Sequence, residues 1–201
     1  MSSVELGCRC GQIQGHLTMP AVKTNHVVCY CKDCQAFAHW LSDQECLNSA
    51  SGTHIVQVPP SAFHISQGQQ QLACMRLSAK GLYRWYSRCC HTPIANTVGA
   101  GFPMVGIIHA FIRSGQDSLP PPMPVNVSNA TAPVAANEQS GGLIVLRDLS
   151  RILWWKATGK NQPNTLFRQG KAVVEPQMAS QAPASHEAAK PMSSLPVGSW
   201  S

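Results

Sequence analysis

Three cysteines, Cys29, Cys31 and Cys34, lie within one six-residue segment of the chain. Thiolates are ligands for Zn²⁺, and sulfurs this close in sequence can converge on one ion if the backbone turns around them. Zinc with three protein ligands keeps an open position, as in catalytic sites, whereas four protein ligands close a structural site. We therefore predict that these three thiols hold zinc and carry any chemistry.

Two further pairs of cysteines are far apart in the sequence and can complement each other. Cys8 and Cys10 precede Gly11, which is suited to the left-handed conformation of a tight turn. Cys89 and Cys90 follow an aromatic-rich strand, and His91 comes next. Joined through a second zinc ion, the two pairs would connect the beginning of the domain to a late strand.

The order of these motifs, C-x-C-G, then C-x-C-x-x-C, then a late cysteine cluster, resembles the glutathione-dependent formaldehyde-activating enzyme family (the GFA, or centromere protein V/GFA, domain). The resemblance covers about residues 5–112 and is that of a divergent branch. It implies a zinc-stapled all-β fold, the β-tent, with a catalytic zinc on Cys29, Cys31 and Cys34. It also implies that Cys8, Cys10 and Cys89 hold a structural zinc.

The sequence departs from that family at the fourth structural ligand. The usual last motif is C-x-x-C-G, whereas Thr92 stands three residues after Cys89 and no glycine follows. The fourth ligand is Cys90, or His91, or it is missing. We accordingly expect one or two Zn²⁺ per chain.

Composition limits the classes of function. Of 201 residues, 15 are Lys or Arg and 9 are Asp or Glu, a net charge of +6 that permits anionic ligands but makes a nucleic-acid partner unlikely. No apolar run is long enough to span a membrane, and no signal peptide is visible. We expect a cytoplasmic protein with reduced cysteines. The sequence does not indicate its oligomeric state.

Short runs bounded by turn residues predict a mainly β fold of antiparallel strands. The predicted strands are 12–17, 25–30, 54–58, 62–65, 71–77, 82–86 and 94–97. Phe37, Trp40 and Leu41 recur at helical spacing, which predicts one short helix directly after the metal loop, and Asp33 could cap its N-terminus.

Beyond the β domain, assigned to residues 1–113, the pattern changes. A Pro/Ser/Ala-rich composition predicts a linker without order over 114–142. Residues 143–176 are expected to form an amphipathic helix and a possible final strand containing Val173 and Val174, followed by a disordered tail, 177–201. The apolar stripe and the cationic face of the helix consist of Leu146, Leu149, Ile152 and Leu153, and of Arg147 and Arg151. Three alternative roles are considered for this helix: it packs across the β domain, it lies on a membrane surface, or it closes over a substrate.

The remaining thiols and imidazoles give weaker signals. Cys46 and Cys74 are interpreted as small buried side chains. The histidines at 16, 26, 39, 54, 64 and 109 have no metal-ligand spacing to one another and are interpreted as surface or core residues.

Two functions remain. One is a zinc-dependent carbon–sulfur lyase-like enzyme, like S-(hydroxymethyl)glutathione synthase, in which the open zinc position binds a small thiol or polarises a carbonyl. The resemblance suggests glutathione and formaldehyde as its reactants. The other is a non-catalytic, zinc-stabilised module that binds a protein or nucleic-acid partner.

Overall fold

The computed structural model describes residues 3–18, 24–134 and 142–180. This part of the chain is mainly β, with two α-helices. The helices are α1 (Lys32–Trp40) and α2 (Gly142–Ala157). The strands are β1 (Ser3–Gly7), β2 (Gln14–Thr18), β3 (Asn25–Cys29), β4 (Thr53–Val58), β5 (Phe63–Gln67), β6 (Leu72–Arg76), β7 (Tyr83–Ser87), β8 (Pro93–Thr97), β9 (Val105–Ile108), β10 (Met123–Val125), β11 (Phe167–Arg168), β12 (Lys171–Ala172) and β13 (Gln177–Met178).

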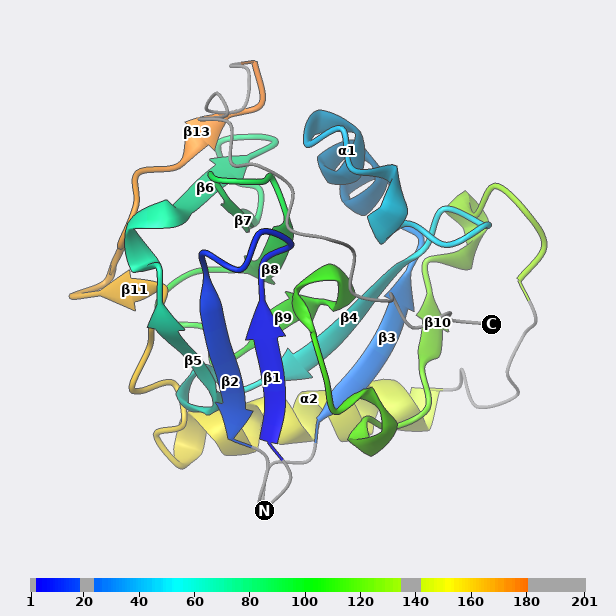
Figure 1. The fold of residues 1–201 in the computed structure, drawn as a ribbon. Helices are drawn as coiled ribbons and strands as arrows, with labels where there is room; N and C mark the ends of the chain where they lie inside the picture. The colour runs from blue at the N-terminus through cyan, green and yellow to red at the C-terminus, as the bar shows by residue number, and fades with distance from the viewer. Residues whose placement is uncertain (1–2, 19–23, 135–141, 181–201) are drawn as a thin grey trace.

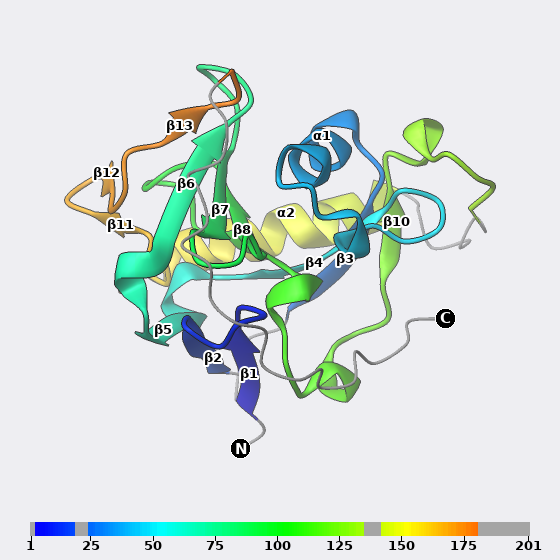
Figure 2. The ribbon, with the colours of Figure 1, turned by 45° about the horizontal axis from the view of Figure 1, so that its top comes forward.

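The seven predicted strands are confirmed as β2 to β8, with ends that differ by up to two residues. Their order in the large sheet is β10-β3-β4-β9-β8-β7-β6-β13. The six central strands are antiparallel, as expected, whereas β10 and β13 pair in parallel with β3 and β6 at the two edges. This order places the ends of β3 and β7, which carry the cysteine motifs, in one sheet (Figures 1 and 2).

A small sheet, β1-β2-β5, encloses the main core against the large one. Leu6, Leu17 and Phe63 from the small sheet pack in one cluster with Val56 and Trp85 from the large sheet. The strands of the small sheet approach closely at Gly15, where a Cβ atom would lie 2.1 Å from the His64 carbonyl oxygen. Only glycine fits there.

Helix α1 covers a second core on the opposite face of the large sheet. Its apolar residues Phe37, Ala38 and Leu41 pack with Met75 and Tyr86. Trp40 meets the Tyr86 ring edge-on, with 5.4 Å between the ring centroids. The predicted helix after the metal loop is thereby confirmed, and its apolar face fixes the loop to the sheet.

Helix α2 runs across the strands of the large sheet in both views (Figures 1 and 2). The expected helix is confirmed, but the predicted apolar stripe is wrong at Leu153, which is 66% exposed. Among the described side chains of α2, Trp155 is buried, at 1%, and Arg151, one turn before it, donates to the Asn25 side chain. These contacts turn Leu153 to the outside. The side chains of Leu146, Arg147 and Leu149 lie outside the described residues.

Two segments predicted to lack order are partly ordered. Residues 123–125 of the assigned linker form β10, an edge strand in which Pro124, with no N–H to donate, is acceptable. Residues 177–178 of the assigned tail form β13 beside β6. Of these two segments, residues 135–141 and 181–201 lie outside the described residues.

The expected final strand is replaced by a short hairpin, β11 and β12, which ends before Val173. Leu166 and Phe167 nevertheless join the main core, so this segment packs on the β domain. Val173 is 40% exposed and does not belong to that core. In the described part of the chain, neither helix combines the length and the apolar character needed to cross a membrane.

Candidate metal centres

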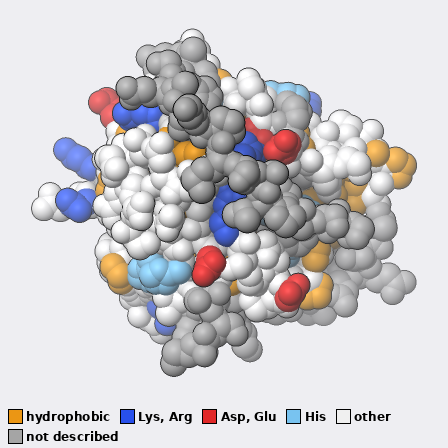
Figure 3. Space-filling model, in the orientation of Figure 1, with side chains coloured by type: hydrophobic (Ala, Val, Ile, Leu, Met, Phe, Trp, Pro, Cys, Tyr) orange, Lys and Arg blue, Asp and Glu red, His pale blue; other side chains and the backbone are white. Residues whose placement is uncertain are grey.

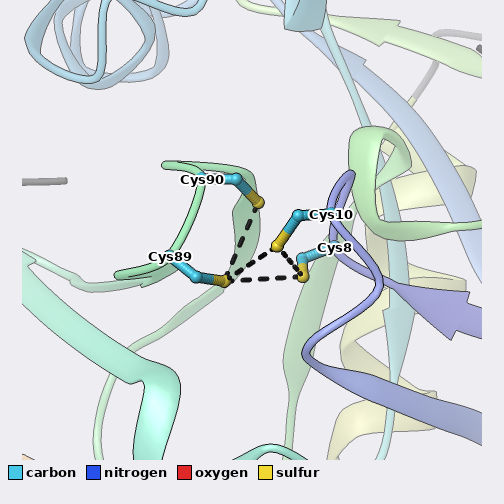
Figure 4. Close-up of side chains that lie close together, drawn as sticks. All are labelled: Cys8, Cys10, Cys89 and Cys90. Carbon is cyan, nitrogen blue, oxygen red and sulfur yellow. Dashed lines mark hydrogen bonds between the residues drawn. The ribbon is translucent and has the colours of Figure 1, made fainter. Parts of the chain in front are cut away.

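Four cysteine sulfurs converge at the first candidate centre, from the turn after β1 and the turn after β7 (Figure 4). The Sγ atoms of Cys8 and Cys10 are 3.5 Å apart, and those of Cys8 and Cys89 are 3.7 Å apart. Cys89 Sγ lies 3.2 Å from Cys10 Sγ and 3.9 Å from Cys90 Sγ. Zinc–sulfur bonds of about 2.3 Å in a tetrahedron require sulfurs about 3.8 Å apart, so this donor set fits zinc.

A tight turn presents the first two of these sulfurs. Gly11 has φ +74°, the left-handed conformation expected of it, and its N–H donates to the Cys8 carbonyl at 3.0 Å. The backbone N–H of Ile13 donates to Cys8 Sγ at 3.2 Å. This backbone donor would favour the thiolate form of Cys8 once a metal ion binds.

The structure brings Cys90, and not His91, into the first centre. His91 has φ +52°, and its N–H donates to the Ser87 carbonyl, which closes the turn that holds the adjacent cysteines. The His91 ring is turned toward Tyr86 instead. Of the three alternatives for the fourth ligand, the geometry therefore supports Cys90.

Thr92, which stands where the resembling family has a cysteine, supports the first centre without joining it. Its Oγ1 accepts a hydrogen bond from the Arg9 N–H at 3.0 Å and lies 3.2 Å from Cys90 Sγ. One fully buried hydroxyl thus connects the early loop to the late one. Arg9 also forms an ion pair with Asp43, in which Nη2 donates to both carboxylate oxygens at 2.6 Å. Sequence reasoning missed Asp43, because nothing in its local pattern marks it.

The second candidate centre is the predicted one, with the sulfurs of Cys29, Cys31 and Cys34 within 4.8 Å of one another. Cys29 ends β3, Cys31 is the N-cap residue of α1, and Cys34 lies in its first turn. Backbone N–H groups of Cys34 and Gln35 donate to the Cys31 carbonyl and hold the turn. Among the described residues, no further His, Cys, Asp or Glu joins the group.

The segment 123–130 straps this loop in place. The N–H of Tyr30 donates to the Val125 carbonyl, and Gln35 Nε2 donates to the Asn129 carbonyl at 3.0 Å. Asn126 Nδ2 lies 3.5 Å from Cys29 Sγ and donates to it. Sequence reasoning missed Asn126, because its surroundings have the composition of a linker. Its φ of +57° is a conformation that asparagine tolerates better than most residues.

In each cluster, hydrogen bonds between the cysteines favour the thiolate form of one cysteine and the thiol form of its neighbours. At the second centre, donation from Cys31 and Cys34 lowers the pKa of Cys29 to about 2, and the same contact with Cys29 raises the pKa of Cys34. At the first centre, the contact between Cys8 and Cys90 lowers the pKa of Cys90 to about 3 and raises that of Cys8. A bound cation would displace the remaining thiol protons.

Asp33 does not cap α1 as predicted, because no side-chain hydrogen bond caps this helix and Cys31 occupies the N-cap position. The Asp33 carboxylate instead lies 3.6 Å from Nη2 of Arg84, a buried residue of β7. Sequence reasoning missed Arg84, since an arginine inside a predicted strand is ordinarily assigned to the solvent face.

The remaining cysteines and histidines agree with their predicted roles. Cys46 and Cys74 are buried, and burial raises the pKa of each to about 12. His26 and His54 are buried and lie 3.1 Å apart, Nε2 to Nδ1. His16 and His64 stack on the small sheet.

On the face seen in Figure 3, the described basic side chains are scattered and form no continuous stripe of the kind that nucleic-acid binding uses.

Comparison with known proteins gives a family without a function. A family model described as a family of unknown function, DUF6151, matches residues 1–177. No curated protein matches the sequence. A solved Rhodobacter sphaeroides protein, a structural genomics target, is 13% identical, with 59% of this chain and 98% of that chain covered and a TM-score of 0.41.

Proposed function

The chain belongs to the family of unknown function DUF6151, and we propose that it is a zinc-dependent carbon–sulfur lyase-like enzyme, which joins a small thiol to an aldehyde or splits their adduct. Cys29, Cys31 and Cys34 would hold the zinc ion of the active site. The motif order supports this proposal through its resemblance to the glutathione-dependent formaldehyde-activating enzymes. On that basis glutathione is a candidate thiol.

One observation carries the proposal, namely the unequal number of donors in the two centres. The first centre gathers four sulfurs, whereas the second gathers three. No further His, Cys, Asp or Glu of the described residues joins those three, and the Asn126 amide nitrogen, which donates to Cys29, cannot serve as a ligand. Four protein ligands close a structural zinc site, and three leave a position for substrate.

The reaction requires no oxidant or reductant. The thiol sulfur forms a bond to the carbonyl carbon, the carbonyl π bond breaks, and the thiol proton passes to the carbonyl oxygen, which gives a hemithioacetal. Zinc, when bound, would supply an open position at which a thiol is held as thiolate or a carbonyl is polarised. The protein contributes three sulfurs on a turn that α1 and the strap 123–130 keep rigid. Asn126 donates to Cys29 and would thereby reduce the charge that this sulfur places on a bound zinc ion.

The first centre would have a structural role. It joins Cys8 and Cys89, which are 81 residues apart, and so would staple the small sheet to the end of β7. Its sulfurs leave no position for a further ligand. The expected zinc staple of the β fold is thus proposed at Cys8, Cys10, Cys89 and Cys90.

Cobalt substitution tests the proposal, because the spectrum of tetrahedral cobalt bound to thiolates changes when a sulfur replaces an oxygen ligand. Glutathione added to the cobalt-loaded chain should shift the spectrum, and Cys34→Ser should abolish the shift. Cys46→Ala, at a buried thiol outside both centres, is the control and should leave the thiol response intact. Faster consumption of formaldehyde in the presence of glutathione should accompany the response.

An unchanged spectrum at millimolar thiol would reject the enzyme. In that case the three-sulfur centre is closed to thiols, and the zinc-stabilised module without catalysis becomes the better account of the fold.

A further inference from the structure

Arg84 carries a charge that its surroundings satisfy only in part. Its side chain is 1% exposed, yet neither Nε nor Nη2 has a hydrogen-bond partner among the described residues. Nearly all buried polar groups in folded proteins are paired, so two free donors on one buried guanidinium point to a missing ligand.

The rest of the guanidinium is fixed in orientation. Nη1 donates to Asn96 Oδ1 at 3.3 Å, and the Phe37 ring of α1 lies against the group, 5.5 Å from Cζ to the ring centroid. The two donors left over, Nε and Nη2, point to the same side of the planar group. This pair is the fork with which arginine binds both oxygens of a carboxylate.

Asp33 connects the free fork to the loop that carries the three-sulfur centre. Asp33, directly before Cys34 in the loop, approaches Nη2 to 3.6 Å, which balances charge but is too long for a hydrogen bond. The register of the large sheet aligns a polar row of Asn25, Gln57, Gly106, Asn96 and Arg84 across five strands. Asn25 and Cys29 are four residues apart on β3, so this row and the Cys29 thiol are on one face of the sheet.

Asp33 also provides a route from solvent to the buried group. Its side chain is 65% exposed, whereas that of Arg84 is 1% exposed, so the ion pair connects the interior to the surface. Rotation of the Asp33 side chain into water would leave the fork free for another anion. Asp33 is then a competitor that occupies the position in the absence of ligand.

We infer that Arg84 determines the specificity of the Cys29, Cys31 and Cys34 site, and that the thiol bound there carries a carboxylate, which replaces Asp33 at the Nε and Nη2 donors of Arg84. This inference rests on the proposed function, since it assigns the second anchor of the same ligand. It adds a requirement that the three sulfurs alone do not impose, a negative charge on the thiol.

A pair of thiols of matched length separates the two claims. In the cobalt-loaded full chain, 3-mercaptopropionate should bind about tenfold more tightly than 3-mercapto-1-propanol, because only the former has a carboxylate that can form a charge-assisted pair with the arginine. The proposed function predicts that both thiols shift the cobalt spectrum. The ratio of their dissociation constants reports on recognition of the carboxylate.

Three variants and one control variant test whether Arg84 causes this ratio. Arg84→Met should reduce the ratio to about one while binding of the neutral thiol persists, and Arg84→Lys should keep only part of the preference because it lacks the fork. Asp33→Asn, an exposed change that leaves the buried arginine in place, should raise the ratio. Asp117→Asn, with the same change of net charge at another exposed site, should not.

Nitrogen NMR gives a result that does not depend on thiol binding. In the zinc-loaded chain, the Nε–H resonance of Arg84, assigned as the one lost in Arg84→Lys, should shift on titration with acetate and shift further in Asp33→Asn. An unmoved resonance would overturn the inference even if thiols bind the metal, as would equal ratios in the wild type and Arg84→Met. If the resonance shifts but neither thiol changes the cobalt spectrum, Arg84 binds anions and the proposed lyase-like function is wrong.

Discussion

The staple at the first centre should dominate the stability of the domain. It bridges 81 residues between Cys8 and Cys89, and the entropy lost by an unfolded chain closed over such a loop corresponds to about 4.5 kcal/mol. The second centre closes a loop of only six residues, for which the same relation gives about 2.2 kcal/mol. Total stabilities are about 5 to 15 kcal/mol, so loss of the long staple is severe.

Replacement of one ligand in each centre compares the two loops directly. Cys10→Ser, with EDTA to remove weakly held metal, should lower the melting temperature by about 9 to 18 °C, from a shift of about 2 to 4 °C per kcal/mol for a chain of this size. Cys31→Ser under the same conditions should cost about half as much, and Cys46→Ala, at a buried thiol outside both centres, should cost least. Thermal unfolding followed by circular dichroism measures all three.

Two results would refute this reasoning. If Cys10→Ser melts within 2 °C of the wild type, the four sulfurs do not staple the fold. If Cys31→Ser is the more destabilised variant, loop length does not determine the contribution of each centre.

Other consequences of the structure concern the strap, helix α2 and the buried histidines. Asn126→Gly keeps the positive φ but removes the amide that donates to Cys29. The variant should bind metal at the second centre about tenfold more weakly, or weaker still, as measured by competition with a chelator. An unchanged metal affinity would show that the contact is incidental. Trp155→Ala should lower the free energy of unfolding by about 3 to 5 kcal/mol, whereas Trp154→Ala, at a half-exposed neighbour, should change it by less than about 0.5 kcal/mol; similar losses would contradict the orientation of α2. Burial lowers the pKa of His54 from 6.5 to about 4, so the stability that its neutral form contributes is complete above pH 6.5 and is lost as the pH falls toward 4. The free energy of unfolding, measured with urea, should therefore fall by about 1 kcal/mol more between pH 7.5 and pH 5.5 in the wild type than in His54→Asn. An equal fall in the two proteins would show that His54 does not cause this pH dependence.

Local patterns were sufficient for most of the elements. The strands that pack on the core have alternating or continuous apolar residues, and Phe37, Trp40 and Leu41 mark the inner face of α1. The three-sulfur centre was predictable for the same reason, since its ligands lie within one turn. Helix α2 was predicted as an element, but its rotation depends on Arg151 and Trp155, whose partners are remote in sequence.

Contacts between distant segments set the limits of the prediction. The choice of Cys90 as the fourth sulfur depends on the positive φ of His91, which no residue pattern specifies. The role of Asn126 depends on the parallel pairing of β10 with β3, in a segment where prolines suggest a linker. Arg84 could not be assigned to the interior before Asp33, Phe37 and Asn96 were placed around it.

The number of zinc ions per chain tests the central claim, two separate cysteine centres, most directly. Elemental analysis of the full chain purified without added metal should give two equivalents of zinc in the wild type, one in Cys34→Ser, and one in a variant that carries both Cys8→Ser and Cys10→Ser. A variant that combines all three changes should give none. Less than half an equivalent in the wild type, with the thiols of both clusters free to alkylate, would contradict the account.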